Sequence, residues 1–456
     1  MSQKNPVVFI HGNGDSAEGW QVQLERFKAN GYAENELFAI TMTPPQNESH
    51  QHYADQVKPF VADVLQQTGR SKVNIVAHSL GCTVARHYIK HMGGDKIVDR
   101  AVLICGGNHG IPAADLTMNQ PEIFKQSPEV NTMGASFLND LNTGNPKGLE
   151  TFGPTEYMTI CGPDDEFYLF YESSPQLKGA DNRTIRGYGH FGLRSCEESF
   201  QLMIAFFSGN RDQLSIGKDP MPDASTDPFG EWYIAGGPNN GMEICLNTDG
   251  TYVAKESGQI SKGTFTTEPQ AFIHRISLNQ IEGPGNSGKR EGIYRLNVNK
   301  TFLRLAVSDL NVLEPPQFIA FAPTYERRFE TNPIIKELLG TWHVNNPGFL
   351  IAAGWTNAKL SIQDNAQFVF EGDNTMSPTG KVRIAGNVTI SLKPSPHHIS
   401  FGISETDGNV PFFVLGEVLP GLFHLQDKNL YIQWGSATFG IPRPACLDAP
   451  IMLRQE

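Results

Sequence analysis

Two kinds of hydrophobic pattern divide the chain near Gly209. Up to about residue 208, short runs of apolar and β-branched residues alternate with amphipathic segments, as in a parallel sheet with crossover helices. Segments 53–69 and 82–94 are expected to be helices, because both are amphipathic and end in glycine. The expected strands are residues 6–10, 36–42, 72–77, 99–105, 156–161 and 182–187. The pattern predicts an α/β domain over residues 1–209.

The second half has a different pattern. Residues 210–225 are rich in Pro, Asp and Ser and are predicted to be a linker. Beyond them, short strands are separated by turn signals such as NTDGT and ETDGN, with scarcely any helical periodicity. This pattern predicts an all-β region.

The all-β region is expected to contain a duplication of about 110 residues, over 226–331 and 337–456. Each copy opens with a G-x-W triplet, at Gly230–Trp232 and Gly340–Trp342, and each ends in a strand that carries arginine. The triplets resemble the opening of lipocalin-like small barrels. Two barrels are therefore expected, and one continuous β-sandwich is the alternative.

Length and charge narrow the class of protein. A chain of 456 residues is longer than one hydrophobic core usually organises, so two or more domains are expected. Its formal net charge of −12 argues against a nucleic-acid partner, because neutralising phosphates needs clustered Lys and Arg. No apolar run approaches the ~18–20 residues of a spanning helix.

The sequence does not determine the cellular compartment of the protein. The start, MSQKNPVVFI, shows no leader pattern, so we expect a soluble chain. It would be extracellular if a signal peptide was trimmed, and cytoplasmic otherwise. The sequence does not predict an oligomeric state.

A candidate nucleophile follows the strand at 72–77. This strand runs into Ala77-His78-Ser79-Leu80-Gly81 and then into an expected helix, the context required of a nucleophile elbow. Small residues must flank Ser79, because the turn is strained and the strand and helix approach closely. Gly81 meets that need on one side and Ala77, in place of the usual glycine, on the other. The alternative is a chance A-H-S-L-G at the end of a buried strand.

Acyl transfer also needs hydrogen-bond donors for the developing oxyanion. The first strand ends in His11-Gly12-Asn13-Gly14, which would bring a backbone N–H beside Ser79. We assign the backbone N–H groups of Asn13 and Leu80 to this role. An ordinary glycine-rich turn is the alternative for the first of them.

The candidate base and acid follow the last two strands of this half. Gly187 to Leu193 form a glycine-rich loop that carries His190 toward the serine. The preceding strand ends in a turn with three carboxylates, of which Asp165 should lie deepest, with Asp164 in reserve. The two carboxylates that do not bond His190 are expected to be solvated.

A metal site is not expected. His87 and His91 have i, i+4 spacing on a helix but lack the adjacent glutamate of a zinc-binding H-E-x-x-H motif. The six cysteines include no C-x-x-C pair.

Together, VNIVAHSLG, the acid turn GPDDEF and the loop GYGHFGLRS resemble bacterial lipases of the small, minimal α/β-hydrolase type over about residues 6–208. Those lipases share the alanine at the position of Ala77. The resemblance implies hydrolysis of acylglycerols or related hydrophobic esters, through an acyl-enzyme and at a lipid–water interface. It implies no cofactor.

The connection over residues 106–155 is longer than this minimal fold needs, and it contains the amphipathic piece GASFLNDLN. It is expected to be either a lid over the site or a decorative insertion. Candidates for contact with substrate or for the lid are Trp20, Phe137, Leu138 and Phe191. The β-rich half resembles the accessory barrels of some larger lipases and would dock on insoluble substrate.

Two other functions compete with a lipase or esterase. A depolymerase of polyesters such as polyhydroxyalkanoates would use the same three residues on a related fold. A non-catalytic binding protein would keep the fold without the chemistry.

Overall fold

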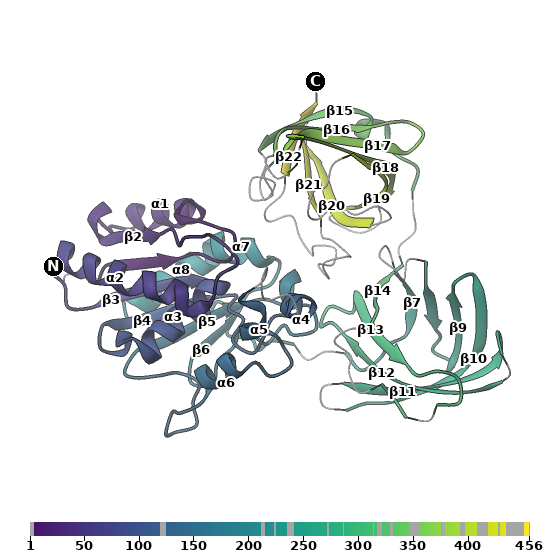
Figure 1. The fold of residues 1–456 in the computed structure, drawn as a ribbon, viewed down its shortest axis with the longest axis horizontal. Helices are drawn as coiled ribbons and strands as arrows, with labels where there is room; N and C mark the ends of the chain where they lie inside the picture. Colours follow the sequence, from purple (N-terminus) through teal and green to yellow (C-terminus); the bar gives the residue numbers. More distant parts are fainter. Residues whose placement is uncertain are drawn as a thin grey trace. The chain divides into compact units, whose positions relative to one another are not determined.

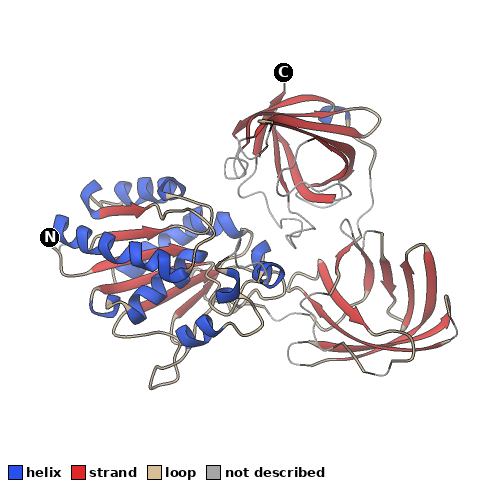
Figure 2. Ribbon diagram, in the orientation of Figure 1, coloured by secondary structure: helices blue, strands red, loops and turns tan. Residues whose placement is uncertain are grey.

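The chain forms two compact units, residues 1–221 and 222–456 (Figure 1). Helices gather in the first unit, and the second is built almost wholly of strands (Figure 2). Parts of the predicted linker (211–214 and 223–224) and of the expected lid (119–124) lie outside the described residues. The computed structural model describes residues 4–118, 125–210, 215–222, 225–234, 241–270, 273–285, 287–312, 314–316, 322–328, 332–346, 355–374, 377, 379–392, 397–407, 418–426, 429–434 and 451–455.

A six-stranded parallel sheet forms the centre of the first unit, in the order β2-β1-β3-β4-β5-β6. Strands β1 and β3 are buried along their whole length, which explains their nearly continuous apolar sequences. The strands are β1 Val7–Ile10, β2 Leu37–Ile40, β3 Val73–His78, β4 Val98–Ile104, β5 Glu156–Cys161 and β6 Asp181–Thr184.

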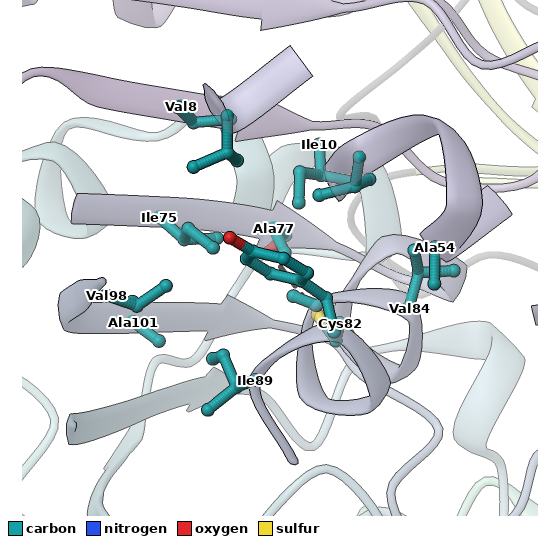
Figure 3. Packing of buried hydrophobic residues seen from close by; sticks show 14 of the residues in the cluster. Val8, Ile10, Ala54, Ile75, Ala77, Cys82, Val84, Ile89, Val98 and Ala101 are labelled. Atoms are coloured by element: carbon teal, nitrogen blue, oxygen red, sulfur yellow. Dashed lines mark hydrogen bonds between the residues drawn. The ribbon is translucent and has the colours of Figure 1, made fainter. Parts of the chain in front are cut away.

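Helices cover both faces of this sheet. Helices α2 and α3 pack on one face, where Val8, Ile75 and Ala101 meet Ala54 and Val84 (Figure 3). The opposite face carries α1 and α8, whose phenylalanines join the apolar side chains of β1, β3, β4 and β5. The helices are α1 Gln21–Ala29, α2 His50–Thr68, α3 Leu80–His91, α4 Pro112–Thr117, α5 Ser127–Val130, α6 Ser136–Asn142, α7 His190–Ser195 and α8 Glu197–Phe207.

The insertion between β4 and β5 carries α4, α5 and α6, and a buried arginine ties it to α3. Nη1 of Arg86 donates to Oδ1 of Asn108 across 3.1 Å. Nη2 donates to the carbonyls of Leu141 and Glu150, at 3.0 and 2.9 Å, and to Oδ1 of Asn142 at 2.7 Å. Burial lowers the pKa of Arg86 to about 10, so the guanidinium is still charged at neutral pH. The C-terminal end of α6 is thus fixed to α3.

Part of the predicted linker packs on the first unit. The backbone N–H of Thr184 donates to the carbonyl of Gly217 across 2.9 Å. Nη1 of Arg183 donates to the carbonyl of Ile216 across 2.8 Å. These contacts extend the hydrogen bonding of β6, the edge strand.

The second unit contains two closed barrels of eight antiparallel strands each, β7–β14 and β15–β22. Strands adjacent in sequence pair with each other, and the last strand of each barrel pairs with its first. The two-barrel prediction is confirmed, and the single β-sandwich is wrong. The strands are β7 Gly230–Tyr233, β8 Glu243–Leu246, β9 Thr251–Glu256, β10 Gln259–Glu268, β11 His274–Glu282, β12 Gly288–Leu296, β13 Phe302–Val307, β14 Thr324–Arg327, β15 Gly340–Asn346, β16 Trp355–Ile362, β17 Gln367–Asn374, β18 Lys381–Ser391, β19 His397–Asp407, β20 Val418–Gln426, β21 Asn429–Trp434 and β22 Ile451–Gln455.

The two G-x-W triplets occupy equivalent places. Trp232 and Trp342 are both 1% exposed, and each indole N–H donates to the carbonyl four residues earlier, at 2.8 and 3.0 Å. Opposite Trp232 stands Arg327, whose guanidinium lies 5.2 Å from the indole ring. The residue opposite Trp342 is Gln455, not the neighbouring Arg454. Both closing strands carry an arginine, as the sequence predicts, but only Arg327 of β14 stands opposite the tryptophan of its barrel.

Among the described residues, none of the helices has the length and apolar content that crossing a membrane requires.

Candidate active site

Ser79 stands at a strained turn between β3 and α3. Its φ of 54° and ψ of −124° lie outside the conformations that L-residues prefer. The Ser79 N–H donates to the carbonyl of Ile104 across 2.9 Å, which ties the turn to β4. A Cβ atom on Gly81 would lie 2.5 Å from the carbonyl oxygen of His11, so only glycine fits where α3 passes the end of β1. The half-buried serine is thus held at the top of the sheet.

The loop after β1 runs against this turn. A Cβ atom on Gly12 would lie 2.8 Å from the Cβ of Ser79. Asn13 follows, and its Oδ1 accepts a hydrogen bond from Nε2 of Gln126 at 3.3 Å. Leu80 is the first residue of α3, where backbone N–H groups lack partners within the helix and the helix dipole is positive. The two segments that carry the expected oxyanion donors therefore meet at Ser79.

His11 holds this loop, a role that the sequence reading missed. Its Nε2 accepts from the backbone N–H of Met42 at 2.8 Å, so its proton resides on Nδ1. Nδ1 is 2.7 Å from the carbonyl of Gly12 and donates to it. Burial lowers the pKa of His11, which favours the neutral form that both hydrogen bonds need.

His190 and Asp165 form a buried pair. Nδ1 of His190 lies 2.9 and 3.0 Å from the two carboxylate oxygens of Asp165. The two side chains are 3% and 1% exposed. The carboxylate also accepts from the backbone N–H of Phe167 at 3.1 Å, which fixes its orientation. The imidazole is thus oriented by Asp165, the deepest of the three carboxylates in the turn.

The other two carboxylates of this turn are not merely solvated, and that expectation is wrong. Oδ2 of Asp164 accepts from the backbone N–H of Gly187 at 2.7 Å. Oε2 of Glu166, which is 8% exposed, accepts from the backbone N–H of His190 at 3.1 Å. The reason is that the acid turn folds back along the histidine loop, so all three carboxylates meet donors of that loop.

His78, the residue before the candidate nucleophile, contacts the same histidine. Its ring centroid lies 4.6 Å from that of His190, and its Nε2 lies 3.0 Å from the His190 carbonyl. Only a protonated Nε2 can donate to a carbonyl. Burial, together with the nearby His190 and Arg194, holds the pKa of His78 well below its usual value. His78 is therefore neutral, with its proton on Nε2.

Three buried side chains here have metal-binding chemistry. Ligand atoms of His78, Cys105 and His190 lie within 4.8 Å of one another. Burial, and then the charge of Asp165, raises the pKa of the Cys105 thiol well above its usual range, which disfavours the thiolate that binds metals. Nδ1 of His190 is already bonded to Asp165. The trio therefore fits packing beneath the site better than a metal centre.

His87 and His91 have separate partners. Nε2 of His87 lies 2.7 Å from Oε1 of Gln51, and Nε2 of His91 lies 2.6 Å from Oδ2 of Asp140.

The apolar candidates differ in their surroundings. Phe191 is half-buried, with its ring 5.5 Å from that of His190. Trp20 is fully buried between Phe9 and His78, so its assignment to substrate contact is corrected: its ring supports the site from within the core.

The two lid candidates lie in the insertion. Phe137 packs between the rings of His50 and His87, at 4.6 and 5.6 Å. Leu138 is 4% exposed and belongs to a small apolar cluster within the insertion, with Val130.

Comparison with known proteins finds a lipase family over part of the chain. The class 2 lipase family matches residues 4–153. That segment includes Ser79 and ends before Asp165 and His190. The resemblance to bacterial lipases is confirmed, and the match supports hydrolysis of an ester.

Solved structures give further similarities. The mature form of a Bacillus licheniformis lipase is 21% identical, and the match covers 45% of this chain and 93% of that one, with a TM-score of 0.39. Its propeptide form is 14% identical over 89% of this chain and 96% of that one, with a TM-score of 0.41. Lipase B of Aspergillus fumigatus is 14% identical over 46% and 55%, with a TM-score of 0.37.

Proposed function

We propose that this chain is a carboxylic ester hydrolase for hydrophobic acyl esters, with Ser79 as nucleophile, His190 as general base and Asp165 as the orienting acid. The observation that carries the proposal is the buried Asp165–His190 pair, at 2.9 Å, beside a strained serine turn. The class 2 lipase match over residues 4–153 supports the same chemistry.

The proposed reaction follows from these positions. His190 takes the proton of Ser79 Oγ as the oxygen attacks the ester carbonyl. The developing oxyanion receives hydrogen bonds from the backbone N–H groups of Asn13 and Leu80. His190 then gives its proton to the departing alcohol, which leaves an acyl group on Ser79. Water then attacks the acyl carbon as His190 takes one of its protons. His190 passes that proton to Ser79 Oγ as the bond between Oγ and the acyl carbon breaks and the acid leaves.

Aromatic side chains around His190 favour a substrate whose acyl group is apolar. The rings of Phe167 and Phe191 lie 4.5 and 5.5 Å from the imidazole of His190. Both phenylalanines are half-buried, so they offer apolar surface next to the reacting atoms. Burying such surface against an acyl chain is worth about 0.8 kcal/mol per CH₂ group.

We assign a docking role to the β-rich half, as the accessory part of a lipase acting at a lipid surface. Val253, Ile260 and Ile281 are 38%, 52% and 59% exposed on neighbouring strands β9, β10 and β11. Exposed aliphatic side chains on adjacent strands are suited to contact with an apolar surface.

A chain-length profile tests the proposal. Wild-type protein and Ser79→Ala are compared on aryl esters of increasing acyl length, on a triglyceride emulsion and on a polyester film. Ser79-dependent hydrolysis that favours longer acyl esters is the expected result. Faster release from the film than from the emulsion would favour a polyester depolymerase. A wild-type protein that hydrolyses none of them would count against the proposal and favour a non-catalytic binding protein.

A further inference from the structure

The loop that carries His190 has little stiffness of its own. Two of the three residues before the histidine, Gly187 and Gly189, are glycines, and Gly187 adopts a φ of +81°. Glycine leaves the backbone its widest conformational freedom. A general base must nevertheless be held within a few tenths of an ångström of its working position. The residues before His190 therefore contribute little restraint, which must come from α7, which begins at His190, and from groups outside the loop.

Two side chains from different turns restrain the backbone N–H and the carbonyl of His190. The carboxylate of Glu166 accepts the His190 backbone N–H at 3.1 Å. The Nε2–H of His78 donates to the His190 carbonyl at 3.0 Å. Both contacts are buried, where hydrogen bonds are not exchanged with water. We call this pair of contacts the His190 clamp.

Each half of the clamp is adjacent in sequence to a residue of the proposed catalytic set. Glu166 follows Asp165, and His78 precedes Ser79. The acid turn therefore holds both the imidazole and the backbone N–H of His190. In the same way, the serine turn carries the nucleophile and also holds the carbonyl of the base. The base is thus tied to both turns, so its position relative to Asp165 and to Ser79 depends on both contacts.

We propose that His78 and Glu166 are positioning residues, which fix the backbone of His190 so that its imidazole stays aligned between Asp165 and Ser79. This inference rests on the proposed function. The clamp acts on the proton transfers and leaves the binding of the acyl chain alone. Its loss should therefore lower kcat and leave KM nearly unchanged.

The test measures kcat, KM and the thermal midpoint on a short soluble ester, at a temperature where circular dichroism shows each variant folded. His78→Phe keeps the ring shape without the donor, and Glu166→Ala removes the acceptor. We expect each to lower kcat about 10- to 100-fold, as a displacement of about 1 Å would. KM should stay within about twofold. His78→Gln and Glu166→Gln keep a donor and an acceptor, and should recover kcat to within about threefold of wild type.

A matched control separates positioning from stability. Glu172 is a buried carboxylate that accepts a backbone N–H at the same 3.1 Å distance, from Phe170. Glu172→Ala should lower the thermal midpoint and keep kcat. If His78→Phe does not fold, His78→Asn replaces it, because its amide is too short to reach the carbonyl. If Glu166→Ala does not fold, Glu166→Met replaces it, because methionine also lacks the carboxylate.

The outcomes separate the clamp from the function it serves. Ser79-dependent hydrolysis by the wild type is the reference, and its absence counts against the proposed function. If the wild type is active and folded His78 and Glu166 variants keep its kcat, the clamp is overturned. An equal loss of kcat in Glu172→Ala would overturn it as well.

Discussion

Gly12 packs so closely on Ser79 that a Cβ atom added to Gly12 would lie 2.8 Å from the serine Cβ. The loop expected to supply one oxyanion donor and the turn that carries the nucleophile are therefore positioned by direct contact. Gly12→Ala must displace one of them, because interiors are close-packed and neither is a flexible side-chain end. We expect kcat to fall at least about 100-fold, a loss comparable to that of an oxyanion donor.

The measurement is the rate of hydrolysis of a short ester. Gly107→Ala is the matched control, since a Cβ there would meet its nearest neighbour, the Tyr168 hydroxyl, at an ordinary 3.6 Å. That variant should keep its rate, and a wild-type rate in Gly12→Ala would contradict the close-contact argument.

The three carboxylates of the acid turn should differ sharply on amide substitution. Asp165→Asn would present an amide N–H to Nδ1 of His190 and favour the wrong imidazole tautomer. We expect kcat to fall about 10³- to 10⁴-fold. Asp164→Asn keeps an oxygen for the Gly187 N–H, so its kcat should stay within about threefold of wild type. Steady-state rates of the two variants show which aspartate orients the imidazole. The reverse ranking would identify Asp164 as the partner of His190.

Stability of the first unit should fall in acid because buried histidines are held neutral. Burial lowers the pKa of His78 and of His11 below the ordinary 6.5, so below that pH the unfolded chain binds protons that the folded chain does not. Their stabilising contribution is complete above about pH 6.5 and is lost as pH decreases. Each group adds up to about 1.4 kcal/mol per pH unit to the slope.

Urea unfolding of wild type and His78→Phe between about pH 5 and pH 7 measures this slope. The free energy of unfolding should depend less steeply on pH in the variant, whatever its stability at neutral pH. Equal slopes would mean that His78 binds protons equally in the folded and the unfolded protein, which contradicts the prediction.

Removal of residues 225–456 should separate two activities. The cut leaves Ile216 and Gly217 in place, whose carbonyls extend the hydrogen bonding of β6. Every residue of the proposed catalytic set lies in the first unit, so hydrolysis of a short soluble ester should persist. On long-chain emulsions, the loss of docking should lower the ratio of long-chain to short-chain activity at least about tenfold, or ~1.4 kcal/mol.

The comparison uses a soluble ester and an emulsion with the same protein preparation. A folded fragment that loses both activities equally would exclude the docking role. Circular dichroism of the fragment identifies the case in which it fails to fold.

Local patterns predicted much of the first unit. The expected strand at 156–161 coincides with β5, and that at 72–77 differs from β3 by one residue at each end. Burial on both faces gives such strands apolar runs that are readable without tertiary information. The serine turn was predicted for the same reason, because strand, glycine and helix are contiguous in sequence.

Contacts between distant segments could not be predicted in this way. The hydrogen bonds of Glu166 and His78 to His190 join segments 24 and 112 residues apart. The three successive acidic residues do not indicate which carboxylate accepts a hydrogen bond from which N–H, because a solvated loop can have the same sequence. The prediction for Trp20 was wrong because the sequence around a tryptophan does not show whether its side chain contacts substrate or packs in the core. In the second barrel, Gln455 replaces arginine opposite Trp342, which only the strand register shows.

The closure of each barrel has a consequence for how such a chain can grow. Because β14 pairs with β7 and β22 pairs with β15, the beginning and end of each module lie side by side. Neighbouring termini allow a whole module to be appended, relocated or circularly permuted without opening its ladder. A single gene-duplication event at the end of a one-barrel ancestor would therefore yield this architecture, with each Trp–carbonyl contact inherited intact.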